Sequence, residues 1–296
     1  MVTDEPIANA TDWDVFLPPE ETPPTLLWHY TSRRAALEIV RKKQVWATDI
    51  RYLNDTKEFA HAIEVVRPLL DEVDSKTSDT KEKSVLSTLR GSLDDLQNIG
   101  HVFVFSLSEV EDDLNQWRGY CPNGGCAIGF GSRTFQRIHT GQEHISLHQC
   151  IYDASEFRDK MRKTLRQVIE RYRALKLEEG GERRAQFAST MPFRIMLRLW
   201  AAVLKNVAFK SEREWRLVCH TDVGSGEFLI RADRDVFTPY IEMQFSQKSE
   251  DLGIDKICIG PSSDASLERT ALESFLRSRY GNRIDITSST VPYRTW

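Results

Sequence analysis

The sequence predicts an α+β fold with a mixed, mainly antiparallel sheet core, flanking helices and a two-helix insert. Short apolar runs bounded by turn residues recur along the chain and cluster in its last third, which is typical of strands. Two long segments with helical periodicity, residues 154–177 and 182–207, follow each other, with Gly180 and Gly181 between them. Late clustering of strands, with helices inserted as a block, favours α+β over a doubly wound sheet.

The individual elements follow from local signals in chain order. Residues 1–25 are rich in Pro, Asp, Glu and Thr and are expected to form an irregular arm. Residues 26–296 are expected to form one domain, with the helical insert at about 154–207. Ser32 is placed to cap a helix at 33–43, and Asn54 or Asp55 to cap a longer one. Further helices are expected to end near Gln97 and to span 112–120 and 264–280. Strands are expected at 26–30, 45–48, 101–106, 126–130, 147–152, 215–219, 227–230, 240–245, 256–259 and 284–287.

Composition and charge narrow the class of protein. The 296 residues include 40 basic and 44 acidic side chains, a formal net charge of −4, which gives no overall field for nucleic acid phosphates or an anionic membrane. No apolar run reaches transmembrane length, and the start of the chain lacks the pattern of a signal peptide. Five cysteines without a C-x-x-C pair fit a reducing compartment, and their spacing matches no standard zinc finger. We therefore expect a cytoplasmic protein with no membrane partner and no bound metal.

Four clusters of polar residues follow strands or lie at strand ends, where rigid elements hold side chains that ligands can still reach. Each cluster also has a purely structural interpretation. Ser32 can be only a cap and His29 a core histidine, Asn54 can belong to a capping box with Glu58, and Trp117 with Tyr120 can be core rather than a stacking surface. The clusters are Trp28-His29-Tyr30-Thr31-Ser32, Tyr52-Leu53-Asn54-Asp55 with Glu58, Phe105-Ser106 followed by Glu111-Asp112-Asp113 and Trp117-Arg118-Gly119-Tyr120, and Lys210-Ser211-Glu212-Arg213-Glu214-Trp215-Arg216.

The last cluster is the densest. In a strand, Glu212, Glu214 and Arg216 point to one face, while Arg213 and Trp215 point to the other. Two carboxylates and a guanidinium on one face form either a surface ladder of ion pairs or a functional site.

Together, these motifs resemble those of DUF2971, a bacterial family of domains of unknown function. The motifs are His29-Tyr30-Thr31-Ser32, Leu53-Asn54-Asp55 with Glu58, Phe105-Ser106, Trp117-x-x-Tyr120, Gly129-Phe130 and Glu212-x-Glu214-Trp215-Arg216, and they extend over nearly the whole expected domain. A more distant likeness is to ADP-ribosyltransferases, which have a histidine on the first strand, a hydroxyl or aromatic residue on a middle strand and a late Glu-x-Glu.

The second likeness implies an ADP-ribosyltransferase-like fold and NAD as the substrate, with no metal. Cleaving the bond between ribose and nicotinamide builds positive charge on the ribose, which a nearby carboxylate stabilises. Glu214 is implied in that role, and Glu212 in orienting the acceptor. NAD binding is implied for the other cluster residues: His29 at a ribose or the adenosine half, Tyr30 or Tyr120 stacked on nicotinamide, Ser106 beside the late carboxylate, and Thr31, Ser32, Asn54, Trp117 and Arg216 around them.

The function expected from this likeness is transfer of ADP-ribose to a macromolecular acceptor, protein or nucleic acid, as by a bacterial toxin or antiphage effector. Two alternatives stay open. One is a metal-dependent nuclease or phosphodiesterase that uses Asp55, Glu58, Asp112 and Asp113 with the two late glutamates. The other is a non-enzymatic module that senses a ligand or binds a partner, in which the same residues are caps and ion pairs.

Overall fold

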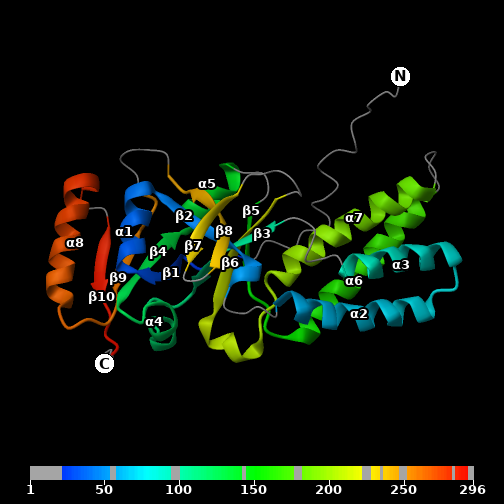
Figure 1. Cartoon of the computed structure of the whole chain (residues 1–296), viewed down its shortest axis with the longest axis horizontal. Helices are drawn as coiled ribbons and strands as arrows, with labels where there is room; N and C mark the ends of the chain where they lie inside the picture. The colour runs from blue at the N-terminus through cyan, green and yellow to red at the C-terminus, as the bar shows by residue number, and fades with distance from the viewer. Residues whose placement is uncertain are drawn as a thin grey trace, which may run out of the picture. The chain divides into compact units, whose positions relative to one another are not determined.

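The computed structural model of the chain (Figure 1) has an α+β architecture, as the sequence predicted. It describes residues 22–53, 58–94, 101–141, 145–176, 182–221, 228–233, 236–246, 252–281 and 284–292. The chain divides into two compact units. One contains helices from residues 57–99 and 153–204, and the other contains the sheet with its own helices from residues 21–56, 100–152 and 205–296.

The helical unit is built from α2 (Glu58–Lys76), α3 (Thr80–Asp94), α6 (Ala154–Lys176) and α7 (Glu182–Ala201), which pack against one another. The two helices expected at 154–207 are therefore α6 and α7, and they share their core with α2 and α3. The prediction that the second helix reaches residue 207 is wrong. It ends at Ala201, and a separate 3-10 helix, η3 (Val207–Glu212), begins after Asn206, whose side chain accepts a hydrogen bond from the backbone of Ala208.

The sheet is mixed and mainly antiparallel, as predicted. Its order is β10-β9-β4-β1-β3-β2-β8-β7, and β6 pairs with β3 and β5 outside this path. Only the pair of β9 and β10 is parallel among the described strands. The strands are β1 (Leu26–Ser32), β2 (Gln44–Asp49), β3 (His101–Ser108), β4 (Gly125–Gly131), β5 (Ile145–Gln149), β6 (Glu214–Thr221), β7 (Leu229–Asp233), β8 (Val236–Gln244), β9 (Lys256–Ile259) and β10 (Asp285–Ser288).

Strand β3 lies in the middle of the sheet, and the way it pairs with its neighbours leaves a cleft beside it. One edge of β3 pairs with β6 along its whole length. The other edge pairs with β1 at Ser108 and with β2 at Phe103 and Val104, so β1 and β2 share this edge and diverge from each other. The middle of β3, around Ser106, lies in the opening between them. Helix α1 (Arg33–Lys42) connects β1 to β2 across this opening.

The two faces of the sheet bury different cores, because side chains alternate along each strand. One face carries the larger core, which includes Leu27, Phe105, Trp215 and Ile39 of α1. The other carries a small core of Trp28, Tyr30, Trp117, Cys121, Ala127 and Cys258 beside α4 (Leu114–Tyr120). Helices α5 (Ser132–Gly141) and α8 (Ala265–Tyr280) and the short 3-10 helix η2 (Ile50–Tyr52) complete the unit.

Local signals explain how the first cluster is placed. Ser32 accepts a hydrogen bond from the backbone N–H of Ala35 at 3.2 Å, so it caps α1 as predicted. Lys43 ends the helix with φ of 54°, a left-handed conformation that turns the chain directly into β2.

In the described parts of the chain, no helix is both long enough and apolar enough to span a bilayer.

Candidate functional site

A cavity of about 60 Å³ opens on the α4 face of the sheet, at the end of β3 that pairs with β1. Most of the predicted site residues line it, although they come from four separate stretches of sequence. The lining residues are Trp28, His29 and Tyr30 of β1, Ser106, Leu107 and Ser108 of β3, Gln116 and Tyr120 of α4, and Glu212 and Glu214.

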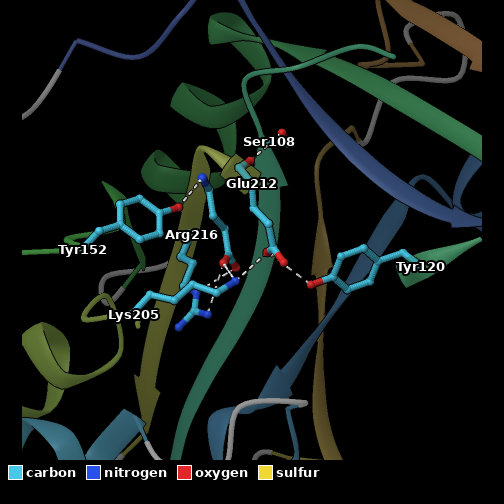
Figure 2. Close-up of polar contacts among 7 residues, drawn as sticks. Ser108, Tyr120, Tyr152, Lys205, Glu212 and Arg216 are labelled. Carbon is cyan, nitrogen blue, oxygen red and sulfur yellow. Dashed lines mark hydrogen bonds and ion pairs between the residues drawn. The ribbon is translucent and has the colours of Figure 1, made fainter. Parts of the chain in front are cut away.

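Two carboxylates in the wall of this cavity are held by two cations (Figure 2). Lys205 lies between the carboxylates: its Nζ donates to Glu212 Oε2 at 2.6 Å and also to Glu214 Oε2. The Nε of Arg216 donates to the other oxygen of Glu214 at 2.8 Å. The side chains of Lys205, Glu214 and Arg216 are at most 5% exposed, whereas that of Glu212 is 14% exposed. The cluster is thus electrically balanced, and Glu212 is its most accessible carboxylate.

The charge state of Glu214 is fixed by these neighbours. Burial disfavours its ionised form, but Arg216 and Lys205 outweigh burial and lower the pKa from its ordinary value of 4.5 to about 2. Burial also disfavours the charged form of Lys205, and Glu214 and Glu212 reverse this and raise its pKa. Glu214 is therefore a permanent negative charge at neutral pH, held at the edge of a cavity.

The backbone around Glu214 explains the geometry of the pair. Arg213 has φ of 45°, so the chain turns sharply between η3 and β6. Glu212 therefore ends the 3-10 helix, and the prediction that it shares a strand face with Glu214 and Arg216 is wrong. Its carboxylate reaches Glu214 through Lys205 instead of through strand alternation. The hydroxyl of Ser108 donates to the carbonyl of Glu212 at 2.8 Å and holds this turn.

The aromatic candidates differ in accessibility. Trp117 is 1% exposed, and its Nε1 donates to Asp112 at 2.7 Å. Tyr30 is 6% exposed, and its hydroxyl donates to the carbonyl of Val110 at 2.8 Å. The two rings pack edge to face with centroids 4.6 Å apart, so both belong to the core and neither is free to stack on a ligand.

Tyr120 is the accessible aromatic side chain of the cavity. It is 39% exposed, and its hydroxyl donates to Glu212 Oε2 at 3.4 Å, a long and weak hydrogen bond. Figure 2 shows its ring reaching toward Glu212 from the side opposite Lys205. Desolvation, followed by the charge of Glu212, raises the pKa of the phenol, so Tyr120 is a neutral hydrogen-bond donor at neutral pH.

His29 connects β1 to the middle of β3. Its Nδ1 lies 3.0 Å from the carbonyl oxygen of Ser106, and because a carbonyl can only accept, Nδ1 carries the proton. Burial lowers the pKa of His29 to about 4, and the bond to Ser106 offsets this only in part. The ring is therefore neutral at neutral pH, and its Nε2 is a hydrogen-bond acceptor.

The remaining predicted residues that the structure describes lie outside the lining of the cavity. Arg216 lies beside Ser106 in the ladder of β3 and β6, and it binds Glu214. Thr31 accepts a hydrogen bond from Cys121 through its carbonyl, and Ser32 caps α1. Neither lines the cavity, although both border a neighbouring pocket. Asn54, with Asp55, lies outside the described residues.

The acidic residues of the metal-site alternative are dispersed in the described part of the chain. Asp112 accepts hydrogen bonds from Trp117, Ser289 and Thr290, and Asp113 caps α4. Among the described residues, no group of three or more His, Cys, Asp and Glu side chains is arranged to hold a metal ion. The two late glutamates face cations rather than further carboxylates.

Four residues of the site were missed by sequence reasoning. Ser108 follows Ser106 at the spacing of one strand face, a signal that strand alternation offers. Tyr152 accepts a hydrogen bond from the backbone of Glu214 at 2.8 Å, and Lys205 binds both carboxylates, but neither position carries a local signal. Gln116 precedes the Trp117 motif and lines the cavity. The residue is 5% exposed, and its amide makes no hydrogen bond with the described residues.

Part of the chain matches the model of a known protein family. The model of a family described as "Protein of unknown function (DUF2971)" matches residues 116–217, the segment that contains Tyr120 and the Glu212-x-Glu214 motif. No curated protein and no solved structure matches the chain. Over residues 116–217 the chain is similar to the DUF2971 family of proteins of unknown function, and this match confirms the resemblance that the motifs indicated.

Proposed function

We propose that this protein cleaves NAD at the bond between ribose and nicotinamide and transfers ADP-ribose to a macromolecular acceptor. The observation that carries the proposal is the convergence of His29, Ser106, Tyr120 and the two glutamates on one cavity. These residues lie far apart in the sequence, and structural caps or surface ion pairs have no need to meet at a common cavity.

The chemistry requires a negative charge that does not titrate. When the bond between ribose C1 and the nicotinamide nitrogen breaks, its electron pair leaves with neutral nicotinamide, and positive charge develops on the ribose. The nucleophile of the acceptor then bonds to C1 and loses its proton. Glu214, ionised because of Arg216 and Lys205, supplies the stabilising charge. Lys205 and Arg216 are positioning residues, since they hold the carboxylates without lining the cavity.

The other cavity residues are assigned by accessibility. Glu212, the more exposed carboxylate, accepts a hydrogen bond from the acceptor or from a ribose hydroxyl. Gln116 offers a buried carboxamide without a partner among the described residues, which matches the carboxamide of nicotinamide. The Tyr120 side chain moves away from Glu212 and then stacks on the nicotinamide ring. A cavity of about 60 Å³ is smaller than the ~300–1,000 Å³ of ordinary ligand pockets, so this movement of Tyr120 is part of the proposal.

A bacterial toxin or antiphage effector that acts on a protein or nucleic acid in the cytoplasm fits this chemistry. The acceptor is then the partner whose modification carries the biological effect. The electrically balanced cluster favours this function over the metal-dependent nuclease, because Lys205 and Arg216 already neutralise both carboxylates.

The test is release of nicotinamide from NAD, measured by chromatography with and without a bacterial lysate as the source of acceptors. We expect release by the unmodified protein and a loss of at least about 100-fold in Glu214→Gln, since a transition-state charge contributes about 3 kcal/mol or more. Glu273→Gln on α8 is the matched control, since this residue pairs with Arg269 on the surface and does not line the cavity. Unchanged NAD in all samples, with no label transferred, would leave the ligand-sensing or partner-binding module as the better account.

A further inference from the structure

A second, larger pocket lies in the cleft between β1 and β2. Its volume is about 820 Å³, within the range of small-molecule sites. His29 lines both this pocket and the small cavity, and the middle of β3 contributes Phe105 to its wall. His29 therefore lies between the two hollows, where its Nδ1 donates to the carbonyl of Ser106.

Cations dominate the charged lining of this pocket. The lining contains three cations, Arg34 and Lys42 of α1 and Arg231 of β7. It contains one carboxylate, Glu38. Residues 34, 38 and 42 are spaced four apart and so lie on one side of the helix. Lys42 is 3.8 Å from Glu38, whereas Arg34 makes no ion pair with the described residues. The pocket thus has an excess of positive charge with a guanidinium available to a ligand.

The remaining lining combines an aromatic surface with hydrogen-bonding groups. The indole of Trp46 is 39% exposed, and the guanidinium of Arg231 lies 5.7 Å from its ring centroid. The Nη2 of Arg231 donates to Thr48 at 3.0 Å, which fixes the guanidinium over the ring. Gln44 is only 8% exposed, lines the pocket, and makes no side-chain hydrogen bond with the described residues. Its carboxamide is therefore placed to hydrogen-bond with a group bound in the pocket.

We infer that this pocket binds the nucleoside diphosphate part of a ligand, with the phosphates at Arg34 and Lys42 and the base at Trp46 and Gln44. Guanidinium and ammonium groups bind phosphate oxygens, an exposed indole stacks on a base, and a carboxamide reads the polar edge of a base. The inference rests on the proposed function for the identity of the ligand, since the adenosine diphosphate half of NAD would lie here with its ribose-nicotinamide end entering the small cavity past His29.

The test is calorimetric titration of the full chain with ADP, adenosine and inorganic pyrophosphate. We expect ADP to bind the unmodified protein, and Arg34→Gln to weaken ADP and pyrophosphate about 10- to 100-fold, because a charge-assisted contact is removed. Trp46→Ala should weaken ADP and adenosine but not pyrophosphate. The matched control is Arg269→Gln, an arginine of α8 that pairs with Glu273 and does not line the pocket.

The outcomes separate this inference from the proposed function. If ADP does not bind, or if Arg34→Gln and Trp46→Ala bind it as tightly as the unmodified protein does, the nucleotide pocket is refuted even where nicotinamide is released from NAD. If ADP binds with the expected losses in both variants but NAD stays intact, the pocket stands and the proposed cleavage fails.

Discussion

Replacing Lys205 with methionine removes the cation between the two carboxylates while keeping an unbranched side chain of similar length. The four groups Lys205, Arg216, Glu212 and Glu214 carry no net charge, so the variant leaves one unbalanced negative charge among side chains that are at most 14% exposed. Breaking a buried ion pair in this way costs about 3–5 kcal/mol.

The pKa of Glu214 gives an independent value for the same perturbation. Its pKa is about 2 instead of 4.5, and at about 1.4 kcal/mol for each pKa unit the fold stabilises the ionised form by about 3 kcal/mol, net of the opposing effect of burial. Part of this stabilisation comes from Lys205, and burial opposes it. We therefore expect Lys205→Met to lower the free energy of unfolding by about 3 kcal/mol, measured by urea denaturation at pH 7.

Two further variants make this measurement decisive. Lys76→Met removes an ion pair with Glu72 at 2.7 Å whose lysine is 71% exposed, and it should cost less than about 1 kcal/mol. The double variant Lys205→Met with Glu214→Gln restores charge balance, so it should be more stable than Lys205→Met alone. A cost for Lys205→Met equal to that of Lys76→Met, or no recovery in the double variant, would refute the reasoning.

Four more predictions concern pH dependence, one backbone hydrogen bond and the buried thiols. Because the pKa of Glu214 is lowered, its stabilising contribution is complete above pH 4.5 and is lost as pH falls toward 2; urea unfolding should show this loss in the unmodified protein and not in Glu214→Gln. Because the pKa of His29 is lowered from 6.5 to about 4, its contribution is present above pH 6.5 and lost toward pH 4, so His29→Gln should flatten the stability profile there. Tyr152→Phe, which removes the acceptor of the Glu214 N–H, should cost about 1 kcal/mol in thermal or urea unfolding, and an unchanged stability would show that this bond is dispensable. Cys121, Cys126 and Cys258 are buried and their pKa values are raised, so a thiol reagent at pH 8 should label them only after unfolding.

Local sequence signals were sufficient for the elements that carry most of the site. The alternating apolar runs placed β1, β3 and β6, and Ser32 was identified as the cap of α1. Both inferences depend on short-range rules, side-chain alternation and hydrogen bonding to nearby backbone groups, so they need no knowledge of tertiary contacts.

Tertiary packing decided what local rules could not. Trp117 and Tyr30 are aromatic residues of the kind that stack on ligands, yet both are buried in the core. Their polar atoms are satisfied there, because Trp117 donates to Asp112 and Tyr30 donates to the carbonyl of Val110. Lys205 follows a long helix and has no motif around it, so only the folded chain brings it between two glutamates. The left-handed conformation of Arg213 is rare for a residue other than glycine, which is why strand alternation failed at Glu212.

The most direct measurement is a crystal structure of the protein with a non-hydrolysable NAD analogue. We expect the ribose next to nicotinamide to lie in van der Waals contact with Glu212 and Glu214. We also expect Tyr120 to have moved away from Glu212, and the diphosphate to lie in the pocket beside Arg34. An analogue bound elsewhere on the chain, or no bound analogue at saturating concentration, would contradict the claim that these motifs form an NAD-cleaving site.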